Sequence, residues 1–239
     1  MRYLVISDVH SNLEALLACF DSAKDFGFKR ILCLGDIVGY GANPNECIEL
    51  LRKKDAICLL GNHDAACIEQ LSLEWFNPLA KQCVEWTKKQ LTMQNRKFLV
   101  ELPVFFSCEW VFAIHGTPTN PIEEYMDEGK AKIALEKVAE DLVLCGHNHV
   151  PFKVEEKGHL EPIEEEETII ELGNKRMVVS LPAVGQPRDR NPKAGYAILD
   201  FKEKTLEIVR VEYEVEKAAE KIKQAGLPEF IAERLKEGK

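Results

Sequence analysis

The first half of the chain alternates short apolar runs, rich in β-branched residues, with longer segments of helical periodicity. Strands and helices in this alternation are typical of an α/β fold. The sequence contains no internal repeat and no low-complexity linker that would divide it. The runs that we expect to form strands are residues 3–6, 30–34, 56–60, 110–114 and 142–145.

Helical segments are expected between these strands. A helix should follow the first strand, with Ser11 and Glu14 forming a capping box at its start. Residues 69–102 read as a longer helical region outside the sheet, broken near Asn77 and Pro78.

The second half of the chain has more strand-like character, which predicts a second sheet. Residues 155–171 contain eight glutamates, and we interpret them as a solvated hairpin or loop rather than a binding element. Residues 215–236 look like two short helices broken at residues 226–228, exposed or at an interface. The expected strands are residues 150–154, 168–172, 176–181, 195–201 and 205–213.

Length and charge limit the class of protein. A chain of 239 residues with 46% hydrophobic residues can bury a large core, and we expect one domain over residues 1–239 with a helical tail at about 215–239. A net charge of −9 disfavours binding to nucleic acid. The first ten residues lack the apolar stretch of a signal peptide or membrane helix, so a cytoplasmic protein without a membrane partner is expected.

Polar residues follow each of the five strands predicted in the first half. The carboxyl ends of strands in an open α/β sheet converge on one crevice, so these side chains should meet there. They combine histidines, carboxylates and an amide. This set has more ligands than one tetrahedral zinc needs, and more nitrogen donors than calcium or magnesium sites use. Two transition ions bridged by Asp36 fit this set better. The residues are Asp8, His10, Asp36, Asn62, His63, His115, His147 and His149.

The order of these clusters resembles the calcineurin-like metallophosphoesterase superfamily, whose pattern is D-x-H, G-D, G-N-H-(D/E), a later His, and G-H-x-H. The match spans residues 1–151, and residues 38–47 and 184–189 resemble a branch of small prokaryotic phosphodiesterases. The resemblance implies a four-layer αββα sandwich with two mixed β-sheets flanked by helices.

The resemblance also implies roles for the clustered residues. One ion would be held by Asp8, His10, Asp36 and His149, and the other by Asp36, Asn62, His115 and His147. His63 then stays free to donate a proton to the leaving group, and Asp64 would help to orient it. We expect manganese in both positions, with iron, zinc, cobalt or nickel as alternatives.

One departure from the superfamily concerns Gly39 and Tyr40, which stand where its protein Ser/Thr phosphatases carry an Asp-Arg pair. Protein phosphatase activity is therefore in doubt. Phosphate contacts should come from elsewhere, and Arg188 and Arg190 are candidates because guanidinium groups match phosphate oxygens. A surface turn with incidental charges is the competing interpretation.

The expected function is hydrolysis of a small phosphodiester or phosphomonoester by a hydroxide that two metal ions activate. A dinucleoside polyphosphate hydrolase and a non-catalytic metal-binding scaffold are the alternatives, while the −9 charge counts against a nuclease. The expected partner is a small phosphorylated or nucleotide-like substrate, and a homo-oligomer is left open.

Overall fold

Two six-stranded sheets form the centre of the fold in the computed structural model, which describes residues 1–74, 76–173 and 175–239. The first sheet contains β1 (Arg2–Ile6), β2 (Arg30–Cys33), β3 (Ile57–Cys58), β9 (Glu167–Glu171), β11 (Ala194–Asp200) and β12 (Thr205–Val211). The second contains β4 (Phe105–Cys108), β5 (Val111–Ile114), β6 (Leu142–Cys145), β7 (Phe152–Glu155), β8 (Leu160–Pro162) and β10 (Met177–Ser180).

Both sheets are mixed. The first has the order β3-β2-β1-β11-β12-β9, with β1, β2 and β3 parallel and β11 antiparallel to β1. The second has the order β4-β5-β6-β10-β7-β8, with β5, β6 and β10 parallel. The predicted division of strands was therefore wrong: β5 and β6 leave the first sheet, and β9, β11 and β12 of the second half complete it.

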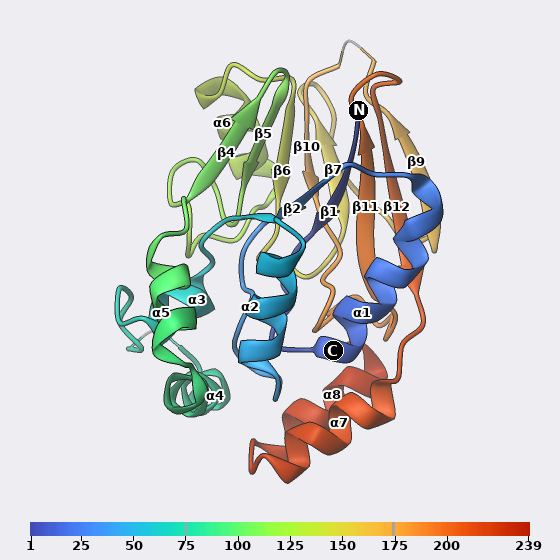
Figure 1. Cartoon of the computed structure of the whole chain (residues 1–239). Coiled ribbons are helices and arrows are strands. Elements are labelled where there is room, and N and C mark those ends of the chain that lie inside the picture. The colour runs from blue at the N-terminus through green and yellow to red at the C-terminus, as the bar shows by residue number, and fades with distance from the viewer. Residues whose placement is uncertain (75, 174) are drawn as a thin grey trace.

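The two sheets pack face to face with helices outside them, as Figure 1 shows. Alternate residues of β1 divide between two cores, since Tyr3 and Val5 face the second sheet while Leu4 and Ile6 face the outer helices. Helices α1 (Leu13–Ser22) and α2 (Pro44–Lys53) pack with the first sheet, and α6 (Glu128–Lys137) with the second. This arrangement confirms the predicted four-layer sandwich of two mixed sheets flanked by helices.

The start of α1 differs from the predicted capping box. Asn12 is the N-cap, and its side chain accepts a hydrogen bond from the backbone N–H of Ala15 at 3.1 Å. Ser11 instead takes a left-handed conformation, with φ of 55°, because its N–H donates to Ile37 in the loop after β2. This long-range contact overrides the local capping signal.

The region predicted as one broken helix is shorter and begins later. The helical parts are α4 (Pro78–Gln90), capped by the Asn77 side chain, and α5 (Met93–Val100). The described residues between Cys67 and Pro78 form turns and bends. A helix that the sequence did not predict, α3 (Asn62–Cys67), precedes them and carries three of the candidate site residues.

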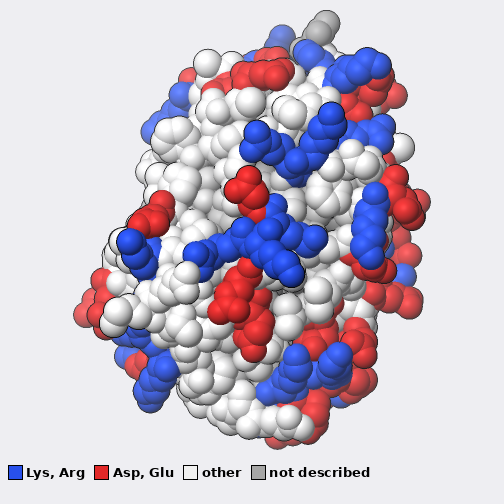
Figure 2. All heavy atoms as spheres, viewed as in Figure 1, with Lys and Arg blue, Asp and Glu red and all other residues white. Residues whose placement is uncertain are grey.

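The C-terminal helices α7 (Val215–Gln224) and α8 (Glu229–Glu237) form a hairpin at the end of the molecule where β1 finishes (Figure 1). Their apolar faces pack with α4 and with Tyr40. Acidic and basic side chains are interspersed on the face shown in Figure 2. Among the described residues, no helix combines the length and apolar character needed to cross a membrane.

Candidate metal centre

The candidate ligands lie in the turns that leave five strands, at the edge where the two sheets meet. Asp8 and His10 follow β1, Asp36 follows β2, and Asn62 opens α3 just after β3. His115 follows β5, and two further histidines follow β6. The structure thus brings these side chains together from both sheets, although the sequence suggested a single sheet.

Backbone strain is concentrated in these turns. A left-handed conformation is uncommon for residues other than glycine and is often found at functional sites. Hydrogen bonds between turns hold it in place, since the N–H of His10 donates to Asp36 at 2.9 Å and that of Gly146 donates to His115 at 3.0 Å. The candidate ligands with positive φ are Asp8, His10, Asp36, His147 and His149.

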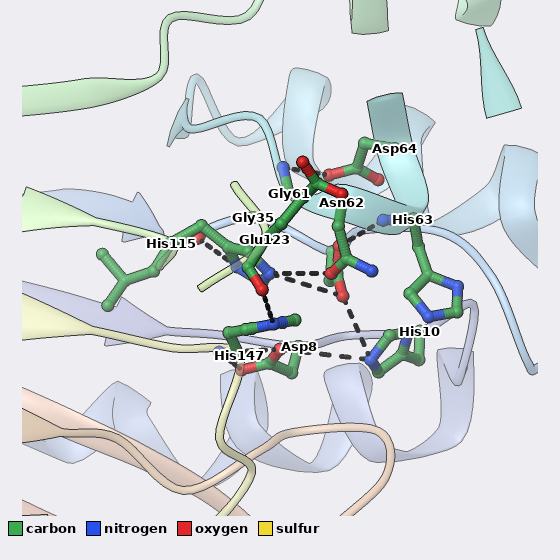
Figure 3. Close-up of polar contacts among 12 residues, drawn as sticks. Asp8, His10, Gly35, Gly61, Asn62, His63, Asp64, His115, Glu123 and His147 are labelled. Atoms are coloured by element: carbon green, nitrogen blue, oxygen red, sulfur yellow. Dashed lines mark hydrogen bonds and ion pairs between the residues drawn. The ribbon is translucent and has the colours of Figure 1, made fainter. Parts of the chain in front are cut away.

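The donor atoms form two groups that share Asp36. Asp8, His10, Asp36 and His149 offer donor atoms that all lie within 4.8 Å of one another. Asp36, His115 and His147 form the second group by the same measure. Asn62 adjoins the second group, because its Oδ1 lies 3.2 Å from His115 Nε2. Figure 3 shows several of these side chains pointing toward one another.

Three histidines are oriented by backbone carbonyls. Nδ1 of His10 lies 3.2 Å from the Val38 oxygen, Nδ1 of His115 lies 2.9 Å from the Leu34 oxygen, and Nδ1 of His149 contacts the Gln186 oxygen. A carbonyl can only accept, so Nδ1 carries a proton in each ring and Nε2 faces the cluster as the candidate ligand atom. This is how protein metal ligands are commonly held.

His147 has the opposite orientation. Its Nε2 lies 3.1 Å from the backbone oxygen of Glu123, which leaves Nδ1 as the candidate ligand atom.

Two facing lone pairs make the first group suitable for a cation. Nε2 of His10 and Nε2 of His149 are 3.1 Å apart, and neither can donate while each Nδ1 binds a carbonyl. Carboxylates flank them, with Asp36 at 3.5 Å from His10 and Asp8 at 3.3 Å from His149. All four side chains are buried. The donor set therefore fits a divalent transition ion.

Burial keeps most of these imidazoles neutral. It lowers the pKa of His10 and of His149, and it lowers the pKa of His147 to about 3. Burial also opposes the charged form of His115, but the carboxylates of Asp36, Asp8 and Asp64 together outweigh it and raise the pKa of His115 to about 9.

Metal affinity should therefore increase with pH through His115. In the metal-free protein His115 holds a proton below about pH 9, and that proton must leave before Nε2 can bind an ion. Calorimetric titration with Mn²⁺ at pH 6.5, 7.5 and 8.5 should show affinity rising by roughly tenfold per pH unit. In His115→Ala this slope should flatten; a slope that His115→Ala leaves intact would contradict the assignment.

His63 lies beside both groups but belongs to neither. Its ring packs against His10, Tyr40 and Phe76, with centroids 4.9, 4.5 and 5.2 Å away. Its Nδ1 is buried and has no hydrogen-bond partner among the described residues. Burial lowers the pKa of His63 to about 4.

Asp64 does not orient His63 as the sequence suggested. Its carboxylate accepts backbone N–H bonds from Ile37, Val38 and Gly61 at 3.0 to 3.2 Å, and it points away from the His63 ring in Figure 3. Burial and the neighbouring Asp36 raise the pKa of Asp64 to about 7. Asp64 therefore fixes the loop after β2 against the start of α3, and acts on the site through the backbone.

Gly39 makes room for His63. Its φ is +93°, and a Cβ at this position would overlap the His63 imidazole. The Asp-Arg pair of the protein Ser/Thr phosphatases has no space here while His63 keeps this position.

Gly39→Ala should lower turnover and cost about 1–3 kcal/mol of stability, because the imidazole must move. Gly27→Ala is the matched control, since Gly27 also has positive φ, at +64°, but no atom lies within 4 Å of the place that its added methyl group would take. It should cost roughly 1–2 kcal/mol from backbone strain alone and leave turnover unchanged. Kinetics and thermal denaturation of both variants test this, and equal turnover in the two would contradict the steric role.

The two candidate arginines are placed differently. Arg188 lies over the Tyr40 ring at 5.8 Å from its centroid, and its guanidinium donates to the Gln186 side chain at 2.9 Å. Its positive charge also contributes to the lowered pKa of His63. Arg190 is exposed, and its backbone N–H donates to Gly238 at the end of α8. Only Arg188 is thus directed toward the centre.

An aromatic-lined hollow borders the centre, which the sequence did not predict. It has a volume of about 150 Å³. Tyr125 and Phe76, which belong to no predicted motif, contribute to it because loops before α6 and α4 bring them there. Its lining residues are Tyr40, Asn62, His63, Phe76, Asn77, Ala80, Glu123, Tyr125 and His147.

Fold and centre together define a metal-binding αββα sandwich. The chain belongs to the calcineurin-like phosphoesterase family, whose model matches residues 1–151. It is 43% identical over 236 residues to an uncharacterised protein of Methanocaldococcus jannaschii, with 97% of this chain and 96% of the relative covered.

Solved structures extend the similarity over the whole chain. A metallophosphoesterase from Sphaerobacter thermophilus is 36% identical with a TM-score of 0.91, covering 100% of this chain and 99% of that one. A hypothetical protein from Pyrococcus horikoshii shares the fold at 20% identity with a TM-score of 0.81, covering 100% and 98%. The resemblance seen in the motifs is therefore confirmed.

Proposed function

We propose that this protein hydrolyses a small phosphodiester or phosphomonoester with the help of two divalent ions. The observation that carries the proposal is the pair of donor groups joined by Asp36. The first ion would be held by Asp8, His10, Asp36 and His149, and the second by Asp36, Asn62, His115 and His147. Bound there, the ions would supply positive charge at the phosphoryl oxygens and lower the pKa of the attacking water.

His63 would assist departure of the leaving oxygen as a hydrogen-bond donor. A buried Nδ1–H without an acceptor is costly, so the neutral ring carries its proton on Nε2 and presents an N–H donor there. The rings of Tyr40 and Phe76 and the backbone of Gly39 fix its orientation. Its backbone N–H donates to Asp36 Oδ1 at 2.9 Å, which ties its position to the shared carboxylate.

A panel of substrates together with elemental analysis tests this function. Purified protein should retain divalent metal and hydrolyse p-nitrophenyl phosphate, its bis-ester, or both, when manganese is supplied. Stable metal binding without hydrolysis of any ester would favour the non-catalytic scaffold of the same fold. A higher rate with the diester would support the phosphodiesterase interpretation, in keeping with the absence of the Asp-Arg pair.

Arg188 is proposed to bind a phosphoryl oxygen. Arg188→Ala should raise KM by roughly 10–100-fold, the equivalent of one lost charge-assisted hydrogen bond, and leave metal content unchanged. Arg190→Ala is the matched control, since it removes the same charge from the same loop at an exposed position. Equal KM values for the two variants would exclude a direct contact by Arg188.

A further inference from the structure

The hollow beside the centre has both polar and aromatic lining residues. Asn62, His63 and His147 belong to the candidate site, and Tyr40, Phe76 and Tyr125 contribute the aromatic rings. These rings come from three separate loops, which lie after β2, before α4 and before α6.

Tyr125 and Phe76 each pack against the imidazole of a candidate site residue. Tyr125 stacks on His147 with centroids 4.0 Å apart and planes at 15°, yet it remains 50% exposed. Phe76 meets His63 edge to face at 5.2 Å and 72°. An aromatic surface therefore extends outward from the two imidazoles.

The position of His63 decides which part of a substrate enters the hollow. His63 borders the hollow, and a proton donor must lie within hydrogen-bond reach of the leaving oxygen. The organic group attached to that oxygen then extends into the adjacent space. A cavity of about 150 Å³ suffices for a benzene-sized ring.

The charge of the lining argues against a second phosphate in this space. Among the described residues that line the hollow there is no lysine or arginine, and Glu123 contributes a carboxyl group. The lining therefore offers no cationic side chain to pair with a further phosphate, whereas a neutral ring with amino or hydroxyl donors is compatible with Glu123. This disfavours a polyphosphate chain that runs through the hollow.

We propose that the hollow binds the leaving group, and that this group carries a flat conjugated ring, as in a nucleoside or aryl ester. The inference rests on the proposed phosphoesterase function. Stacking of a base on an aromatic side chain contributes about 1–3 kcal/mol, which corresponds to roughly 5–150-fold in affinity.

Matched esters test the proposal without differences in leaving-group chemistry. Adenosine 5′-monophosphate and ribose 5-phosphate share the same leaving oxygen and differ in the base, and cytidine 5′-monophosphate and benzyl phosphate test smaller rings. With manganese, kcat/KM should be at least roughly fivefold higher for the ring-bearing nucleotides than for ribose 5-phosphate. In Tyr125→Leu this ratio should fall toward one. Phe105→Leu is the control, because Phe105 is similarly exposed, at 52%, but lies on β4 away from the hollow.

A binding measurement separates this inference from the proposed function. Saturation-transfer NMR on the metal-loaded protein should show contact with the ring protons of the nucleotide, and the contact should weaken in Tyr125→Leu. The inference would be overturned, and the function would stand, if all esters were hydrolysed with equal kcat/KM for nucleotides and ribose 5-phosphate and no ring contact were seen. Ring contact without hydrolysis of any ester would overturn the proposed function, but it would still support binding of a flat ring in the hollow.

Discussion

Asp36→Asn is expected to remove metal binding from both donor groups at once, because the Asp36 carboxylate belongs to both. Loss of several kcal/mol of charge stabilisation should reduce kcat/KM by about 10³-fold or more. Elemental analysis and kinetics on the same preparation measure both effects. Asparagine keeps an oxygen for the hydrogen bond from the His63 N–H, so the start of α3 should stay in place.

Asp200→Asn provides the control for this variant. Asp200 is also a buried aspartate of the first sheet, but its carboxylate pairs with Arg2 at 2.7 Å and takes no part in either donor group. It should keep both metal and turnover. Full metal occupancy in Asp36→Asn would show that the two groups do not depend on a common ligand.

His63→Ala should separate chemistry from metal binding. Turnover is expected to fall by roughly 10²–10⁴-fold, the usual contribution of a positioned proton donor, while metal content stays at the wild-type level. His159→Ala is the control, since the His159 side chain is 87% exposed and contacts Glu128 instead of the centre. Unchanged turnover would remove His63 from the mechanism, and lost metal would assign it a structural role.

The strands and the clusters that follow them could be predicted because their signals are local. A buried parallel strand is a short apolar run, and glycine beside Asp36, Asn62 or His147 marks a tight exit turn. The motif order then identified the family, and with the family the four layers.

The assignment of strands to sheets could not be predicted in the same way. Strands β1 and β6 are both apolar on both faces, so nothing in either run specifies its neighbours. Pairing depends on contacts between distant segments, such as Arg2 opposite Asp200. The capping box predicted for α1 was wrong for a similar reason, since the loop after β2 determines the conformation of Ser11.

The hollow was missed because its residues share no pattern. Phe76 and Tyr125 are isolated aromatic residues in irregular loops, where side-chain periodicity carries no information. Their importance depends on stacking against His63 and His147, which only the folded chain brings about.

The core between the sheets has a consequence for the centre itself. Each donor group draws ligands from both sheets, so the gap that an ion must span depends on how far apart the sheets stand. That separation is set by side chains such as Val5, Ala113 and Leu144, which fill the space between them. The size of these side chains therefore determines the distance between ligands from the two sheets. A larger residue at one of these positions would move the ligands apart and weaken metal binding, although every ligand would still be present in the sequence.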